Sequence, residues 1–232
     1  MTGSPRRTGF AALCLLLAAG FAALGIWQLQ RRVWKLDLIH RVETRIAAEP
    51  APLPPRARWS GDQAYLRVRV SGEYLHDRET LVQAVTDYGA GWWVMTPLRT
   101  GSAILLVNRG FVPPERRDPR TRTGGAPKGT VTVTGLLRTS EPGGAFLRSN
   151  DPAANRWYSR DVPAIARARN LHGAAPFFLD ADATPNPGGY PIGGLTVIAF
   201  PNNHLVYALT WFALSVVSLC GCVLVFRSRA QQ

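Results

Sequence analysis

The chain has 232 residues, which is enough for one domain of ordinary size together with membrane anchors. Its net charge is +12, from 27 basic and 15 acidic residues. No nucleic-acid-binding motif accompanies this charge, so we expect no nucleic-acid partner. Membrane lipids with anionic headgroups are the first expected partner, followed by an anionic cofactor group or an acidic protein.

Two long runs of the chain contain no charged residue, at residues 8–30 and 205–226. Each exceeds the roughly 20 residues that a helix needs to cross about 30 Å of hydrocarbon. We therefore expect transmembrane helices at 10–30 and 204–226, with residues 1–9 and 227–232 on the same side of the membrane. A cleaved signal peptide is the alternative for the first run. Against it, Trp27 lies where an interfacial aromatic residue belongs.

Charge alone does not orient the two spans, because Lys and Arg lie on both sides of the first span and near both ends of the chain. The second span favours a cytoplasmic C-terminus, since residues 190–204 contain no Lys or Arg. Cys14, Cys220 and Cys222 all fall inside the spans, so the region between them needs no disulfide. We interpret these cysteines as small packing residues, with copper binding at Cys220 and Cys222 as a remote alternative.

Residues 31–58 form the expected link between the first span and a folded domain. Helical spacing of apolar residues continues to about residue 49, and prolines from Pro50 onward then end the helix. Residues 59–200 are expected to form a mainly antiparallel β domain. Its expected strands lie at 65–70, with a break at Gly72, and at 81–85, 91–98, 103–109, 130–137, 177–179 and 196–200.

Two segments of this domain depart from the strand pattern. Residues 113–128 are charged and contain proline, which indicates a mobile surface loop. Residues 161–171 are typical of a short helix, because Asp161 is a good N-cap and Pro163 falls in the first turn, where its missing N–H is harmless. The fold class expected for the whole chain is therefore a membrane protein with two transmembrane α-helices flanking a mainly antiparallel β (α+β) domain.

Catalytic patterns are scarce in this sequence. It contains no nucleophile elbow, zinc-protease motif, phosphate-binding loop or dinucleotide-binding motif. Its four histidines are His40, His76, His172 and His204, and no two have the spacing of paired metal ligands. We therefore expect no enzymatic activity.

His204 differs from the other histidines because it lies at the mouth of the second span, where an ionisable residue is costly. A helix would align it with the polar and small residues of that span, namely Ala208, Trp211, Ser215, Ser218 and Cys222. A neutral imidazole there could ligate haem iron, with Tyr207 and Trp211 beside the macrocycle and Arg31 and Arg32 on its propionates. Trp27 of the first span is a further candidate for cofactor binding. The alternative is that His204 only forms an interfacial hydrogen bond and Trp211 only packs.

The first span offers a surface on which the second could pack. Ala19, Ala23 and Trp27 share a helical face, with Gly20, Ala22 and Gly25 close by, and small residues allow helices to approach. In the domain, Arg109 follows an apolar strand and is expected to anchor a turn through backbone carbonyls or a buried acid. Direct cofactor contact is the less favoured role for Arg109. Gly188, Gly189, Gly193 and Gly194 are expected in turns of positive φ.

Several stretches, in order, resemble the surfeit locus protein 1 family. They are residues 24–35, 91–97, 106–113, 135–138, 155–161, 187–189, 193–194 and 203–212. The resemblance implies an assembly factor for haem-copper (cytochrome c) oxidase in the cell inner membrane, with cytoplasmic termini and a periplasmic domain. It also implies haem a binding through His204 and delivery to oxidase subunit I, with haem a synthase as a further partner. A membrane-anchored scaffold without its own cofactor remains the alternative.

Overall fold

The computed structural model describes residues 5–59, 61–101, 103–145, 147–198 and 200–227. The chain divides into two compact units: a helical unit within Met1–Val42 and Ala199–Gln232, and a β unit, Glu43–Ile198. Each unit is described by itself below.

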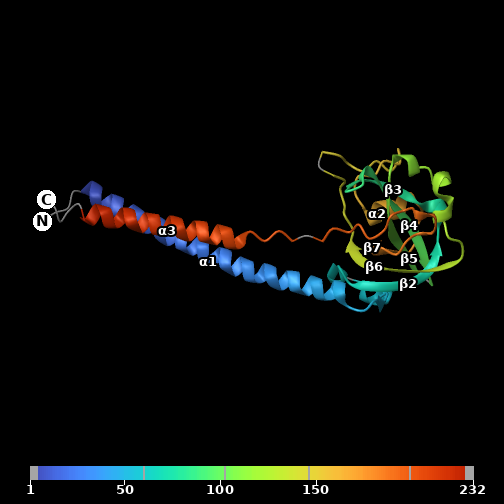
Figure 1. The fold of residues 1–232 in the computed structure, drawn as a ribbon, viewed down its shortest axis with the longest axis horizontal. Coiled ribbons are helices and arrows are strands. Elements are labelled where there is room, and N and C mark those ends of the chain that lie inside the picture. Colours follow the sequence, from blue (N-terminus) through green and yellow to red (C-terminus); the bar gives the residue numbers. More distant parts are fainter. Residues whose placement is uncertain (1–4, 60, 102, 146, 199, 228–232) are drawn as a thin grey trace. The chain divides into compact units, whose positions relative to one another are not determined.

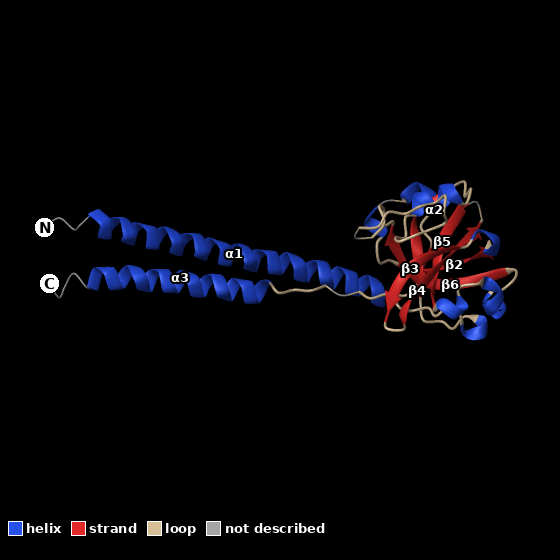
Figure 2. Cartoon of the chain, turned by 90° about the horizontal axis from the view of Figure 1, so that it is seen from above, coloured by secondary structure: helices blue, strands red, loops and turns tan. Residues whose placement is uncertain are grey.

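The helical unit pairs the two long helices of the chain. Helix α1 (Pro5–Ala47) and helix α3 (His204–Arg227) lie side by side in both views (Figures 1 and 2). The expected helical continuation past residue 30 is confirmed, since α1 runs without a break to Ala47. Each helix is long and apolar enough to cross a membrane. Most of their large apolar side chains are exposed, as lipid-facing residues would be; Leu16, for example, is 74% exposed.

The α3 stripe predicted from the sequence faces α1: Ala208, Ser215 and Cys222 are buried, and His204, Trp211 and Ser218 are half-buried. Ser215 Oγ donates a hydrogen bond to the carbonyl of Ala18 at 2.8 Å. The predicted face of α1 is wrong, however, because Ala19, Ala23 and Trp27 are exposed. The residues of α1 that contact α3 form a neighbouring stripe, displaced by one residue from the predicted face. This contact stripe consists of Ala11, Cys14, Ala18, Phe21, Gly25 and Gln28.

The β unit is built on seven strands: β1 (Ala51–Pro52), β2 (Arg67–Tyr74), β3 (Thr80–Thr86), β4 (Gly89–Thr100), β5 (Ala103–Val112), β6 (Thr130–Thr139) and β7 (Ala174–Ala181). Their order is β1-β2-β6-β7-β5-β4-β3, and an added β2–β4 pairing closes five of them into a barrel-like ring. The pairs β1–β2 and β5–β7 are parallel and the others antiparallel. The mainly antiparallel fold is confirmed.

Both faces of the central strand β5 are buried, which explains its continuous apolar run. Leu105 and Val107 pack on one side with Leu98, Leu137 and Leu179. Leu106 packs on the other side with Trp157 and with Ile165 of the short helix α2 (Val162–Ala168). The expected N-cap of this helix is confirmed, since the Asp161 side chain accepts the N–H of Ala164.

Three local predictions differ from the structure. Gly72 does not end β2; a Cβ there would overlap the carbonyl of Arg99, so glycine allows β2 to pass close to β4 and close the ring. Residues 196–198 and 200 are not in a strand, while residue 199 lies outside the described residues. The segment 113–128 is held by two 3₁₀ turns, Pro114–Arg116 and Pro119–Gly125, and by the buried ion pair of Arg122 with Glu79.

Candidate functional site

His204 is the first residue of α3, and its side chain meets Gln28 of α1. The Nδ1 atom of His204 lies 2.7 Å from Oε1 of Gln28. Because an amide oxygen only accepts hydrogen bonds, Nδ1 carries the proton in this arrangement. In the uncharged form of the ring, Nε2 would then carry the free lone pair. The contact therefore selects the tautomer in which Nε2 can bind a metal.

The two aromatic residues predicted beside His204 have different surroundings. Trp211 stacks on Phe21 of α1, with ring centroids 5.6 Å apart. One face of its indole ring is thus used in holding the helices together. Tyr207 is 55% exposed on the surface of the hairpin. It lies one turn from His204 along the same helix, so its ring is open to a molecule bound at His204.

The three site residues predicted on α1 also differ in their exposure and contacts. Arg32 lies four residues after Gln28, on the same helical face, and is half-buried. Arg31 is exposed, and its guanidinium lies over the Trp34 ring, 4.5 Å from the centroid. Trp27 is 51% exposed and lies beside the contact stripe, on the neighbouring face of α1. Arg32 is therefore better placed than Arg31 or Trp27 to act together with His204.

The donor set at His204 fits a haem better than a bare metal ion. Within the described part of the chain, no three His, Cys, Asp or Glu side chains converge to hold a metal ion. A porphyrin brings its own four nitrogen ligands and requires only an axial ligand from the protein. Nε2 of His204 could serve as such a ligand, with its ring held by Gln28 as hydrogen-bonded neighbours hold metal-binding histidines.

Gln28 was missed as a site residue in the sequence, although it lies within the motif at residues 24–35. The signal that identifies it is its spacing from Ala11, Cys14, Ala18, Phe21 and Gly25, at alternating steps of three and four. Glycine at position 25 makes room for the Phe212 ring, because a Cβ there would overlap it. This close approach of the helices brings Gln28 within hydrogen-bonding distance of His204.

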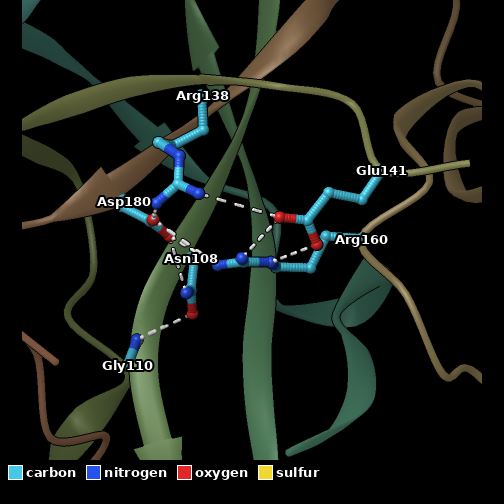
Figure 3. A network of polar contacts seen from close by, with 6 residues as sticks. All are labelled: Asn108, Gly110, Arg138, Glu141, Arg160 and Asp180. Atoms are coloured by element: carbon cyan, nitrogen blue, oxygen red, sulfur yellow. Dashed lines mark hydrogen bonds and ion pairs between the residues drawn. The ribbon is translucent and has the colours of Figure 1, made fainter. Parts of the chain in front are cut away.

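A second polar group occupies the β unit, and no pattern in the sequence predicts that its members meet. The carboxylate of Asp180 on β7 is 1% exposed and accepts hydrogen bonds from Asn108, Arg138 and Arg160 at 2.8, 3.0 and 3.1 Å (Figure 3). Glu141 binds Arg160 through Nη2 and Nε, at 2.6 and 3.0 Å. Two guanidiniums and two carboxylates thus balance one another and tie strands β5, β6 and β7 to the segment that leads into α2.

The electrostatics of this network favour a structural role. Burial alone lowers the pKa of Arg160, but the charges of Asp180 and Glu141 outweigh burial and raise that pKa overall. A cavity of about 580 Å³ lies beside the network and is lined by Asn108, Arg138 and Arg160 and by residues 194–197. Both network carboxylates are engaged by arginines.

Arg109 has the anchoring role expected of it. Its Nη2 atom donates to the carbonyl of Gly125 and, at 2.9 Å, to Oδ1 of Asn186. The side chain therefore joins the end of β5 to two turns far along the chain. Among the glycines expected in turns, Gly188, Gly189 and Gly194 have φ of 73°, 79° and 74°. Gly193 does not have a positive φ; it is needed because a Cβ would overlap the carbonyl of Asp182.

Comparison with known proteins identifies the family. The model of the SURF1 family matches residues 15–216, which include both sides of the His204–Gln28 contact. The chain belongs to the SURF1 family. It is 36% identical over 222 residues to surfeit locus protein 1 of Homo sapiens, covering 88% of this chain and 73% of the relative. With the Mus musculus protein the identity is 39% over 217 residues, covering 86% and 70%.

A third relative is also similar over most of its length. The SURF1-like protein of Monosiga brevicollis is 39% identical over 219 residues, covering 88% of this chain and 82% of the relative. The SURF1 family resemblance drawn from the ordered motifs is thereby confirmed.

Proposed function

We propose that this SURF1 family member is an assembly factor for haem-copper (cytochrome c) oxidase that binds haem a and assists its insertion into subunit I. The observation that carries the proposal is the His204–Gln28 hydrogen bond of 2.7 Å between the two apolar helices. With the ring uncharged, this contact would leave Nε2 as the free nitrogen at the end of a hydrophobic helix pair. Membership of the SURF1 family supports the assembly role.

In this proposal haem a is cargo, and His204 would supply an imidazole nitrogen to its iron. His204 binds through Nε2, and Gln28 holds the ring in orientation. Tyr207 offers an exposed aromatic surface on the same side of α3 as His204. Arg32, with Arg31 beyond it, supplies positive charge for carboxylate groups of the cargo. Trp211 acts mainly by holding α3 against α1, and Trp27 contacts lipid or a protein partner.

We propose that the protein lies in the cell inner membrane, with the start of α1 and the end of α3 in the cytoplasm and the β unit in the periplasm. The lack of Lys and Arg at residues 190–203 and the basic residue Arg227 at the other end of α3 support this orientation. Haem a synthase and oxidase subunit I are the proposed partners, and membrane lipids surround the helices. No chemical conversion by this chain is part of the proposal.

The proposal is tested by purifying the protein from cells that make haem a and measuring Soret absorbance per protein. His204→Ala is expected to abolish or sharply reduce bound haem while the protein stays in the membrane. His40→Ala, His76→Ala and His172→Ala are the matched controls and should retain it. If wild type carries no haem when haem a is made, but copurifies with oxidase subunits, the cofactor-free scaffold replaces the carrier. If another histidine variant loses haem instead, the ligand assignment is wrong.

A further inference from the structure

Strand β3 lies at the edge of the sheet, and its outer side is only partly covered. It pairs with β4 on its inner side. On the outer side the N–H of Gln83 donates to the carbonyl of Trp157 at 2.9 Å. Backbone groups alternate in direction along a strand, so the C=O of Gln83 and the N–H and C=O of Val85 also point outward. Within the described part of the chain, Val82 and Trp157 form the only bridge on this side. These outward groups of Gln83 and Val85 are the free edge of β3.

Apolar surface lies next to this free edge. Val85 is 84% exposed, and Tyr88, in the turn between β3 and β4, is 60% exposed. A cavity of about 520 Å³ opens beside Val85, and its walls include Ala90, Trp92 and Tyr158. An uncovered strand edge is a template for pairing with another chain, and exposed apolar surface beside it is typical of a binding site.

The charges around this cavity are positive. Arg148 lines it and donates a hydrogen bond to Oε1 of Gln83 at 3.2 Å. The guanidinium of Arg117 lies over the Trp92 ring, 4.8 Å from its centroid. Both arginines are exposed, and among the described residues neither forms an ion pair. No acid is among the described residues that line the cavity, and Asp87 of the β3–β4 turn lines the cavity beside Arg160 instead. The surface is therefore complementary to a negatively charged partner.

We propose that the free edge of β3 binds an extended, acidic segment of a partner protein by strand addition. One residue of an antiparallel partner strand can exchange two backbone hydrogen bonds with Val85. Its side chain, and those two residues away, would lie on the same face as Val85, beside the cavity. Apolar side chains there can cover Val85 and Ala90, and a carboxylate can pair with Arg148.

A second copy of this chain fits the free edge less well. Residues 80–86 contain no acid, so pairing of β3 with β3 of another copy would bring no carboxylate from that strand to Arg148. Symmetric pairing would also bring two copies of Arg148 to one edge, where like charges repel. The surface belongs to the β unit and is separate from the haem proposal at His204, so either can fail alone.

The test measures binding of a fluorescent peptide, in which valine and glutamate alternate, to the full chain in detergent. The readout is fluorescence anisotropy at constant ionic strength, and saturable binding is expected. Val85→Pro removes the outward N–H but no bond to β4, and should raise the Kd about tenfold or more. Val85→Thr keeps that N–H and should shift the Kd less than about threefold. In the unsubstituted protein, amide hydrogen exchange at Val85 should slow when the peptide binds.

Charge reversal tests the acidic character of the partner. Arg148→Glu should raise the Kd about fivefold or more, and should improve binding of a peptide with lysine in place of glutamate. Arg69→Glu is the matched control, because Arg69 is exposed on β2 and does not line the cavity. It should shift the Kd less than about twofold. Absence of saturable binding, unchanged exchange at Val85, or equal effects of the two reversals would overturn the proposal.

A second arm identifies the natural occupant. A photo-crosslinking amino acid is placed at Ala90, which is exposed on the cavity wall, and the crosslinked peptide is sequenced after irradiation of cells. We expect a segment of another protein in which acidic and apolar residues alternate. Crosslinks to lipid alone would overturn the proposal. So would crosslinks to a second copy, together with a dimer in sedimentation that Val85→Pro dissociates.

Discussion

The Nδ1 atom of His204 and the side-chain oxygen of Gln28 lie 2.7 Å apart, joining the first residue of α3 to α1. The two residues are 176 positions apart in the chain. This hydrogen bond sets both the tautomer and the orientation of the imidazole ring. If His204 is the haem ligand, Gln28 is its positioning residue.

Replacing Gln28 with Leu should reduce haem retention because the imidazole loses the partner that holds its Nδ1 proton. Loss of such a neighbour typically costs about tenfold or more in metal affinity. We expect a smaller loss than for His204→Ala, and a shifted Soret maximum in the haem that remains. Gln30→Leu is the matched control, since Gln30 is exposed on α1. Equal haem content in the Gln28 and Gln30 variants would contradict the positioning role.

Replacing Gly25 with Leu should separate the helix pair, because a side chain there would overlap the Phe212 ring. Gly20→Leu is the control, since a Cβ at Gly20 meets nothing within 4 Å. The readout is disulfide crosslinking of Ala11→Cys to Cys222, whose Sγ lies 3.9 Å from the Ala11 carbonyl, with Cys14 and Cys220 replaced by Ser. We expect crosslinking to fall only for Gly25→Leu; an unchanged yield would show that the contact stripe is wrong.

Glu79→Gln should destabilise the β unit, because it leaves Arg122 charged and buried without its carboxylate. Breaking one side of such a pair costs about 3–5 kcal/mol. The expected result is a lower denaturation midpoint and faster tryptic cleavage within residues 113–125. Asp118→Asn, which removes an exposed pair with Arg120, should leave the midpoint nearly unchanged. The assignment fails if both substitutions have the same effect.

Gly110→Ala should strongly destabilise the β unit, because backbone strain and a steric overlap combine at this position. Gly110 has φ of 128°, and an added Cβ would overlap the carbonyl of Ile192, which pairs with Phe111. Gly129→Ala is the comparison: φ there is 76°, but the space around it is open, so strain of about 1–2 kcal/mol is expected. Folded yield and denaturation midpoint should both be lower for Gly110→Ala than for Gly129→Ala. Similar values for the two variants would mean that segment 191–193 can shift away from the added Cβ at little cost.

The proposed orientation predicts the activity of reporter fusions. An alkaline phosphatase fusion near Pro119, in the β unit, should be active because it folds in the periplasm. A fluorescent protein after Gln232 should fluoresce because it remains in the cytoplasm. Reversal of the two results would invert the assignment, and both reporters indicating one side would exclude the two-span arrangement.

The sequence by itself determined the two long apolar helices, most strands of the domain and the stripe of α3 that begins at His204. These are periodic or local signals, and they require no knowledge of what lies opposite. The N-cap Asp161 and the turn glycines at Gly188 and Gly189 were predictable for the same reason. Motif order was specific enough to indicate the family.

Only the tertiary structure decided which residues meet. Gln28 became a partner of His204 because Gly25 admits Phe212, and that depends on how two helices pack. Gly72 continues a strand because β2 must approach β4 to close the ring. Asp180, Arg138, Arg160 and Asn108 are separated by up to 72 residues, yet they share one network. Burial of Arg109 between distant turns left Nε and Nη1 without hydrogen-bond partners among the described residues. Such pairings follow from the three-dimensional closure of the fold, which local patterns along the chain do not encode.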